Sequence, residues 1–182
     1  MKTAVIGVGN IIFRDDGIGV YATRFLEENY IFNQEVSFID GGTLGIHLLH
    51  YYEEFEQVFI LDTISLEDKI GSIYNIPSYE LLELGGHKNT AHEVEVSDMI
   101  ATSLFLETPA EIRVLGIVPQ DIISVSIGLS EELEDAFISY TDAILEALLV
   151  GGISATRKEE ITPLHIIIDS YQNPKGTRFE ED

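Results

Sequence analysis

Short apolar runs alternate with amphipathic segments along most of the chain. The runs at 2–8, 36–40, 57–62 and 111–118 are predicted to be strands, and the run at 57–62 is continuous in apolar character, as in a strand covered on both faces. A further run at 71–77 stops at Pro77, which cannot donate a backbone hydrogen bond and is typical of an edge strand. Apolar residues recur at helical spacing between the runs, and this periodicity predicts helices over 17–29, 44–55, 90–106 and 130–150.

This alternation predicts a three-layer α/β/α sandwich with a mainly parallel, twisted sheet of about five strands. The strand at 71–77 is free to run antiparallel at the edge. With 182 residues, the chain suits one sizeable hydrophobic core. We assign 1–152 to a single α/β domain, because the alternation lapses after Gly152. Residues 153–182 then form a C-terminal appendage without an assigned role, which we expect to be dispensable for folding and activity.

The first predicted strand runs into a glycine-rich loop that contains two adjacent carboxylates, Asp15 and Asp16. Glycine at positions 7 and 9 lets the backbone turn sharply, and Gly17 and Gly19 are expected to leave the space around the carboxylates open. Strand-loop-helix joints of this kind lie at the carboxyl edge of an α/β sheet, where ligands bind. The loop is therefore the first candidate for a functional site.

A dinucleotide-binding loop is the obvious interpretation of these glycines, but the spacing does not fit it. The third glycine of the fingerprint falls on Ile12, and Asp15 and Asp16 occupy the place where a pyrophosphate would approach the helix. Two carboxylates repel a pyrophosphate and suit a cation. One of the two could instead be a helix cap.

Composition narrows the classes of function further. Acidic residues outnumber basic ones by 32 to 10, giving a formal charge of −22, which argues against nucleic acid and anionic membrane surfaces as partners. The absence of cysteine excludes disulfides, thiolate zinc sites and a cysteine nucleophile. The sequence has neither a signal-peptide pattern at its start nor an apolar run long enough to span a membrane, so we expect no membrane insertion.

Further candidate ligands follow the other strands. Asp40 ends the second predicted strand and Asp62 the third, although either could be an ordinary turn residue. Thr90 and Glu93 form a capping box that places His92 in the first turn of a helix, where the dipole favours the neutral, metal-binding imidazole. Asp16, Asp62 and His92 together suit a divalent ion such as nickel or zinc.

Competing arrangements are weaker. His47, His50 and Glu54 lie at helical spacing, and we interpret them as ordinary residues of a helix face. The sequence contains no His-Glu-x-x-His zinc motif, no Gly-x-Ser-x-Gly elbow and no Walker loop.

Taken in order, these motifs resemble those of the hydrogenase maturation proteases over about residues 1–150. The matching segments are Gly7-x-Gly9-Asn10, Asp15-Asp16-Gly17-x-Gly19, Asp40-Gly41-Gly42-Thr43, the strand ending in Asp62, and Thr90-Ala91-His92. The resemblance implies a cytoplasmic endopeptidase that removes the C-terminal extension of a nickel-iron hydrogenase large-subunit precursor after nickel insertion. It also implies that Asp16, Asp62 and His92 hold a nickel ion supplied by the precursor, and that no nucleotide is needed.

Roles for the remaining motif residues follow from the same resemblance. Asp16 is the candidate general base, and Asp40, Gly41, Gly42 and Thr43 are candidates for substrate binding. Two other classes of function stay open. One is a nucleotide-dependent oxidoreductase that uses Gly7, Gly9 and Asp40, and the other is a non-catalytic nickel-binding chaperone.

Overall fold

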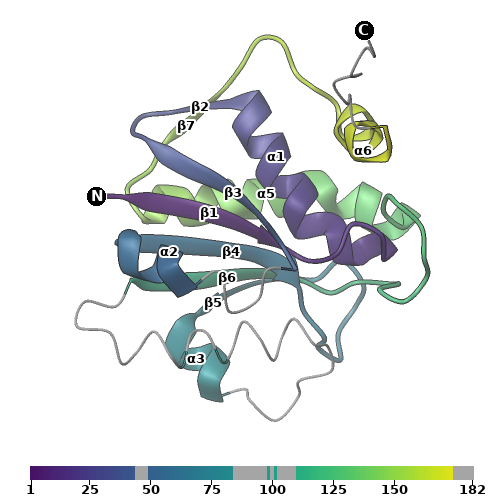
Figure 1. Cartoon of the computed structure of the whole chain (residues 1–182), viewed down its shortest axis with the longest axis horizontal. Helices are drawn as coiled ribbons and strands as arrows, with labels where there is room; N and C mark the ends of the chain where they lie inside the picture. The colour runs from purple at the N-terminus through teal and green to yellow at the C-terminus, as the bar shows by residue number, and fades with distance from the viewer. Residues whose placement is uncertain (44–48, 84–97, 99–100, 102–109, 174–182) are drawn as a thin grey trace, which may run out of the picture.

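The computed structural model describes residues 1–43, 49–83, 98, 101 and 110–173, and at its centre is a five-stranded sheet (Figure 1). The strands are β1 (Thr3–Val8), β3 (Val36–Gly42), β4 (Gln57–Thr63), β5 (Ile73–Pro77) and β6 (Glu111–Ile117). Their order is β3-β1-β4-β6-β5, and all pairs are parallel except the antiparallel pair of β5 and β6 at the edge. The predicted α/β class and the antiparallel edge strand are confirmed.

Side chains of β1 and β4 alternate between two hydrophobic clusters, because successive residues of a strand point to opposite faces of the sheet. Val5 and Phe59 lie in one cluster, whereas Ile6 and Ile60 lie in the other. Both faces of the central strands are therefore buried. This explains why the strands appear in the sequence as continuous apolar runs rather than as alternating patterns.

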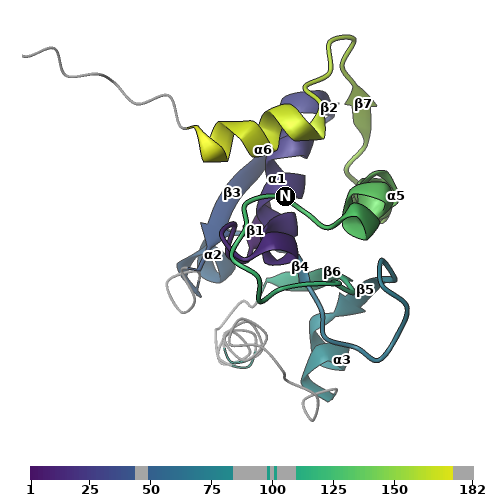
Figure 2. The same ribbon diagram turned by 90° about the vertical axis from the view of Figure 1, so that its right-hand side faces the viewer.

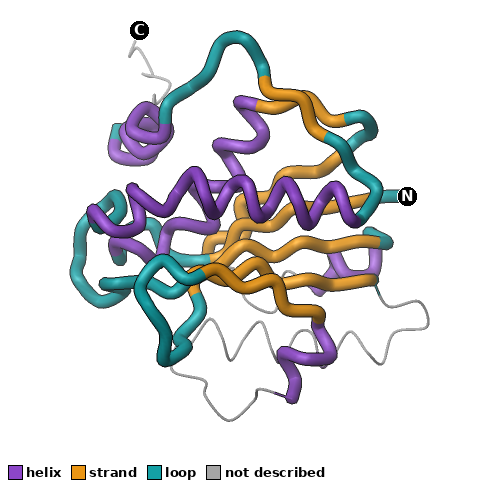
Figure 3. Tube along the Cα trace, turned by 180° about the vertical axis from the view of Figure 1, so that it is seen from behind, coloured by secondary structure: helices purple, strands orange, loops and turns teal. Residues whose placement is uncertain are grey.

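Helices cover both faces of the sheet (Figures 2 and 3). α1 (Ile18–Asn29) and α5 (Glu131–Val150) pack on the face with Val5, where Phe25 and Phe137 meet edge to face with ring centroids 5.2 Å apart. α2 (Leu49–Glu54) lies on the other face, where Tyr51 packs against the second cluster. Among the residues that the structure describes, no helix combines the length and apolar character needed to cross a membrane.

The helix boundaries agree with the sequence where the two can be compared. Ser130 caps α5 as expected, accepting a hydrogen bond from the backbone N–H of Leu133 at 3.4 Å. A short 3-10 helix, η1 (Arg14–Gly17), precedes α1, and α3 (Ser78–Glu83) was not expected. Residues 44–48 of the predicted second helix lie outside the described part of the chain. So does the predicted helix at 90–106, apart from Asp98 and Ala101.

Residues after Gly152 pack on the rest of the molecule as far as the structure describes them. β7 (Ala155–Arg157) pairs with β2 (Tyr30–Phe32), and α6 (Leu164–Gln172) packs against α1. The buried side chains of Ile153, Ile167 and Ile168 belong to the same cluster as Val5. The dispensability of 153–182 stays a prediction, but this packing favours the opposite outcome, because removing the segment would expose part of the core.

Replacing Ile167 by alanine is expected to lower the free energy of unfolding by about 2–5 kcal/mol, because the deletion leaves a cavity in the cluster that α6 completes. Ile166 is the matched control on the same helix: it is 47% exposed, whereas Ile167 is 1% exposed. Its replacement is expected to cost less than about 1 kcal/mol. Urea denaturation measures both values, and equally small losses would show that α6 does not belong to the folded core.

Candidate active site

The turn between β1 and η1 lies at the carboxyl ends of the parallel strands. Gly9 has a φ of +124°, and a Cβ atom at this position would lie 1.7 Å from the backbone oxygen of Asp16. Glycine is therefore required here both by the backbone conformation and by the close approach of Asp16. The sharp turn expected at Gly9 is confirmed.

The expectation that Gly17 and Gly19 leave the space around Asp15 and Asp16 open is wrong, because both aspartates are buried and both glycines are closely packed. A Cβ atom at Gly19 would lie 2.1 Å from the backbone oxygen of Leu61 and 2.6 Å from that of Val8. Gly7 is equally constrained, since its Cβ would lie 2.4 Å from the backbone oxygen of Gly19. α1 thus packs directly on the ends of β1 and β4, and η1 contacts β4.

The two adjacent carboxylates have different tasks. Asp15 is fully buried and accepts hydrogen bonds from the backbone N–H groups of Gln120 (3.0 Å), Asp121 (2.9 Å) and Ser130 (2.6 Å), and from the Ser130 hydroxyl (2.8 Å). This carboxylate is a structural anchor rather than half of a cation site. The helix-cap interpretation also fails, because Gly17 occupies the N-cap of α1.

Asp16 is buried, and its carboxylate is held against the turn. Its Oδ2 accepts a hydrogen bond from the backbone N–H of Asn10 at 2.7 Å, while the Asn10 side chain accepts one from the N–H of Ile12 at 3.1 Å. Backbone hydrogen bonds of this kind orient a carboxylate and leave it able to bind a metal, since its two oxygens offer about four lone-pair sites.

Asp62 is buried near the end of β4, beside Gly116 of β6. Its Oδ1 accepts a hydrogen bond from the backbone N–H of Thr63 at 2.7 Å. Strand alternation places its side chain on the same face of the sheet as that of Ile60. The carboxylate therefore lies at the carboxyl edge of the sheet, as the sequence predicts.

Tyr140 of α5 supports this strand end and was missed by the sequence analysis. Its buried hydroxyl donates to the backbone oxygen of Leu115 at 2.6 Å and lies 3.4 Å from that of Asp62. Burial raises the pKa of Tyr140 well above its usual value, so the phenol stays protonated. The sequence could have indicated this contact, because a tyrosine on the buried face of a helix requires a hydrogen-bond partner for its hydroxyl.

His92 lies outside the described residues, as do its capping-box neighbours Thr90 and Glu93. Within the described part of the chain, no group of three His, Asp or Glu side chains is arranged to hold a metal ion. The assignment of Asp16, Asp62 and His92 as metal ligands therefore stays a prediction.

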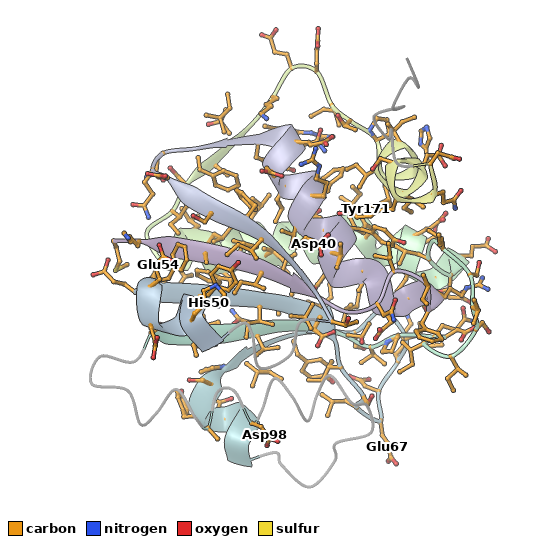
Figure 4. All side chains as sticks on the ribbon, in the orientation of Figure 1. Asp40, His50, Glu54, Glu67, Asp98 and Tyr171 are labelled. Atoms are coloured by element: carbon orange, nitrogen blue, oxygen red, sulfur yellow. The ribbon has the colours of Figure 1, made fainter. Side chains whose placement is uncertain are left out.

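The second helix fits the interpretation as an ordinary surface element. His50 is exposed with its ring centroid 3.8 Å from that of Tyr51, and Glu54 pairs with Lys2 at 3.7 Å (Figure 4). His47 lies outside the described residues.

The segment from Asp40 to Thr43 lies beside the turn that holds Asp16. The backbone oxygen of Gly42 accepts a hydrogen bond from the N–H of Gly9 at 2.9 Å, and Gly41 is buried. Both segments contribute to the lining of a pocket of about 230 Å³, whose lining residues are Gly9, Asn10, Ile11, Val20, Asp40, Gly42 and Thr43. This pocket is the candidate place for a substrate segment next to Asp16.

α6 contributes Tyr171 to the same edge, another residue that the sequence analysis missed. Tyr171 donates a hydrogen bond to Asp40 and packs edge to face on Tyr21, with ring centroids 5.6 Å apart (Figure 4).

Desolvation raises the pKa of Asp40, although hydrogen bonds from Gly42 and Tyr171 oppose the shift. Desolvation and the Asp40 charge raise the pKa of Tyr171 to about 12, so Tyr171 remains a donor. Nothing in the sequence motifs pointed to this contact.

Comparison with known proteins identifies the family to which the protein belongs. Residues 20–162 match the family model described as hydrogenase maturation protease. Because this match spans more than half of the chain, the protein belongs to the hydrogenase maturation protease family, and it is an endopeptidase.

Individual relatives agree with this assignment over most of the chain. The chain is 30% identical over 163 residues to the hydrogenase 2 maturation protease of Escherichia coli K12, covering 88% of this chain and 99% of that protein. The structure of the E. coli hydrogenase maturating endopeptidase HybD matches with a TM-score of 0.79 and 29% identity, over 87% of this chain and 98% of the other. The [NiFe] hydrogenase maturation protease HybD of Thermococcus kodakarensis matches with a TM-score of 0.65 and 26% identity, over 81% and 99%.

Replacing Asp15 and Asp16 singly by asparagine tests whether Asp15 stabilises the fold while Asp16 does not. Asp15→Asn is expected to lower the free energy of unfolding by more than about 2 kcal/mol, because three backbone N–H donors lose a charged, buried acceptor. Asp16→Asn keeps an oxygen for the Asn10 N–H and is expected to stay within about 1 kcal/mol of the wild type. Urea denaturation compares the two, and a larger loss for Asp16→Asn would contradict the assignment.

Proposed function

We propose that this chain removes the carboxyl-terminal extension of a nickel-iron hydrogenase large-subunit precursor after nickel insertion. In this proposal Asp16, Asp62 and His92 recognise the nickel that the precursor carries. The observation that carries the proposal is the presence of two buried carboxylates, Asp16 and Asp62, on elements that the packing of α1 holds together. Two similar proteins, a hydrogenase 2 maturation protease and a [NiFe] hydrogenase maturation protease, support the class of substrate.

A bound cation would compensate the charge of these carboxylates. Ionised carboxylates are costly to bury unless a positive charge compensates them, and neighbouring carboxylates repel one another. The whole chain has a formal charge of −22, which adds to the attraction for a cation. Carboxylate oxygens and a neutral imidazole from His92 form a donor set that suits nickel.

Recognition through three protein ligands leaves coordination positions for the precursor's own ligands. The bound nickel would then position the scissile bond beside Asp16 and Asp62. A precursor without nickel lacks this anchor, so it would be spared. This dependence delays cleavage until the metal has been inserted.

The hydrolysis could proceed in two ways, which differ in the role of Asp16. In one, Asp16 acts as general base and takes a proton from the water that attacks the scissile carbonyl, with the N–H of Asn10 holding the carboxylate in place. In the other, the nickel polarises the carbonyl or activates the water, and Asp16 serves as a ligand only. The pocket lined by Asp40, Gly42 and Thr43 would bind the polypeptide next to the scissile bond.

The geometry gives no support to the dinucleotide alternative. The N–H of Gly9 donates to Gly42 and that of Asn10 donates to Asp16, so two amides that a pyrophosphate would need are already engaged. A non-catalytic nickel chaperone is disfavoured by membership of a protease family. Cytoplasmic location and independence from nucleotides remain predictions.

Substitution of the three proposed ligands tests the function. Asp16→Asn, Asp62→Asn and His92→Ala are each expected to reduce cleavage of a nickel-loaded precursor by at least about a hundredfold, because each removes a metal ligand. The rate is measured by mass spectrometry of the processed large subunit.

His47→Ala and His50→Ala are the controls, since the sequence predicts both histidines on a helix that we interpret as an ordinary surface element. Both variants should cleave at the wild-type rate. Circular dichroism checks that every variant is folded. If folded His92→Ala cleaves the loaded precursor normally, the three-residue site is wrong.

A further inference from the structure

A second pocket lies beside the candidate substrate pocket, between α1, β3 and α6, and we name it the α6 pocket. Its volume is about 540 Å³, against about 230 Å³ for the substrate pocket. Val20 and Asp40 line both pockets, so the two pockets adjoin at these residues. The side chains of the α6 pocket that matter for binding are Val20, Arg24, Glu27, Phe38, Asp40 and Tyr171.

Together the two pockets form a groove that begins next to the turn that carries Asp16. Asn10 lines the substrate pocket, and its backbone N–H donates to the Asp16 carboxylate at 2.7 Å. From there the groove passes Asp40 and continues along α1 as far as Glu27. A residue at one end of the groove therefore contacts the candidate general base directly.

Asp40 is exposed and lies at the junction of the two pockets. Its carboxylate accepts hydrogen bonds from the backbone N–H of Gly42 and from the hydroxyl of Tyr171 on α6 (Figure 4). The two oxygens of a carboxylate offer about four lone-pair sites, so about two further donors can be accepted. Asp40 can therefore bind N–H groups of a ligand in the groove while it keeps both of its contacts within the protein.

Tyr171 is itself held in place on its other side. Its ring packs edge to face on Tyr21, whose hydroxyl donates to the backbone oxygen of Ile11 at 3.4 Å. Ile11 lines the substrate pocket. Packing of α6 on the hydrophobic core fixes the helix that carries Tyr171. Tyr171 thus joins Asp40 to the opposite wall of the substrate pocket, and its position depends on the folded C-terminal segment.

A polypeptide is the ligand that this groove fits. The protein is an endopeptidase, so its substrate has backbone on both sides of the bond that is cut. Val20 and Phe38 give the α6 pocket an apolar lining, and Asp40 offers an acceptor for N–H groups, a combination typical of ligand sites. Arg24 is already paired with Glu27 at 2.8 Å, so the groove does not select for an acidic ligand.

We propose that the α6 pocket and the substrate pocket form one binding groove for the precursor polypeptide, and that Tyr171 positions the Asp40 carboxylate at its middle. This inference rests on the proposed function, which supplies the hydrogenase precursor as the polypeptide. Tyr171 does not touch the reacting atoms in this arrangement, so it is a positioning residue. The segment after Gly152 gains a role, because α6 forms one wall of the groove.

Filling the α6 pocket tests the groove. Ser170 is exposed on α6 and lines this pocket, so the indole of Ser170→Trp would occupy space that the polypeptide needs. The dissociation constant for the nickel-loaded precursor, measured by calorimetry, is expected to rise at least about tenfold. Asp169→Trp is the matched control: it adds the same side chain at the neighbouring exposed position, which does not line the pocket, and should leave the affinity unchanged.

Removing the Tyr171 hydroxyl tests the positioning role. Tyr171→Phe keeps the ring that packs on Tyr21 and removes the hydrogen bond to Asp40. The dissociation constant and KM should both rise about fivefold, the usual effect of losing one hydrogen bond, whereas kcat should not change. Tyr30→Phe is the control, since Tyr30 lies in β2 and lines neither pocket; it should change none of these constants.

A second background shows whether the hydroxyl acts through Asp40. When Asp40→Ala is already present, adding Tyr171→Phe should change the dissociation constant by less than about twofold, because the hydroxyl has lost the group that it positions. A full fivefold change in this background would assign Tyr171 a direct contact or a general structural role and overturn the positioning role. A lower kcat at unchanged KM would also overturn it.

Binding and cleavage are measured separately, so the two proposals can fail separately. If the wild type binds the loaded precursor without cutting it, only the proposed function is overturned, and the dissociation constants still test the groove. Equal affinities of the wild type and Ser170→Trp overturn the groove, as does a wild-type protein with no affinity for the precursor. Equal affinities of the wild type and Tyr171→Phe overturn the positioning role.

Discussion

The buried carboxylate of Asp15 joins segments that are 105 to 115 residues apart in the sequence. It connects η1 to the loop after β6 and to the start of α5 through charge-assisted hydrogen bonds to a carboxylate that is itself fully buried. The next residue is Asp16. The position of this candidate ligand relative to the ends of β4 and β6 therefore depends on the Asp15 contact, as does the shape of the 119–128 loop.

A second constraint acts through glycine. Gly7 and Gly19 let α1 approach β1 and β4 so closely that no side chain fits between them. The helix brings the Asp16 turn to the sheet edge where Asp62 ends its strand, and Tyr140 holds that strand end from α5. The candidate site thus lies at the edge of a sheet that is buried on both faces, and mainly backbone contacts fix the positions of Asp16 and Asp62.

The sequence predicted the central strands well, because strands buried on both faces leave an uninterrupted apolar signal. It predicted α5 because Ser130 marks its start, and it placed Asp62 at a strand end. It could not distinguish the structural role of Asp15 from the ligand role proposed for Asp16. The hydrogen-bond donors to Asp15 lie more than a hundred residues away in the sequence, and the donor to Asp16 is a backbone N–H group. β2 and β7 were missed because three-residue strands carry almost no periodicity. α6 was missed because Ile166, Ile167 and Ile168 are all apolar although only two are buried, which hides the helical stripe.

The central claim is that the protease recognises nickel already bound in its substrate. The most direct test compares cleavage of one precursor preparation before and after nickel loading, using the wild-type protease and mass spectrometry of the large subunit. The account predicts that only the loaded precursor loses its carboxyl-terminal extension. Equal rates for the loaded and nickel-free precursors would contradict it.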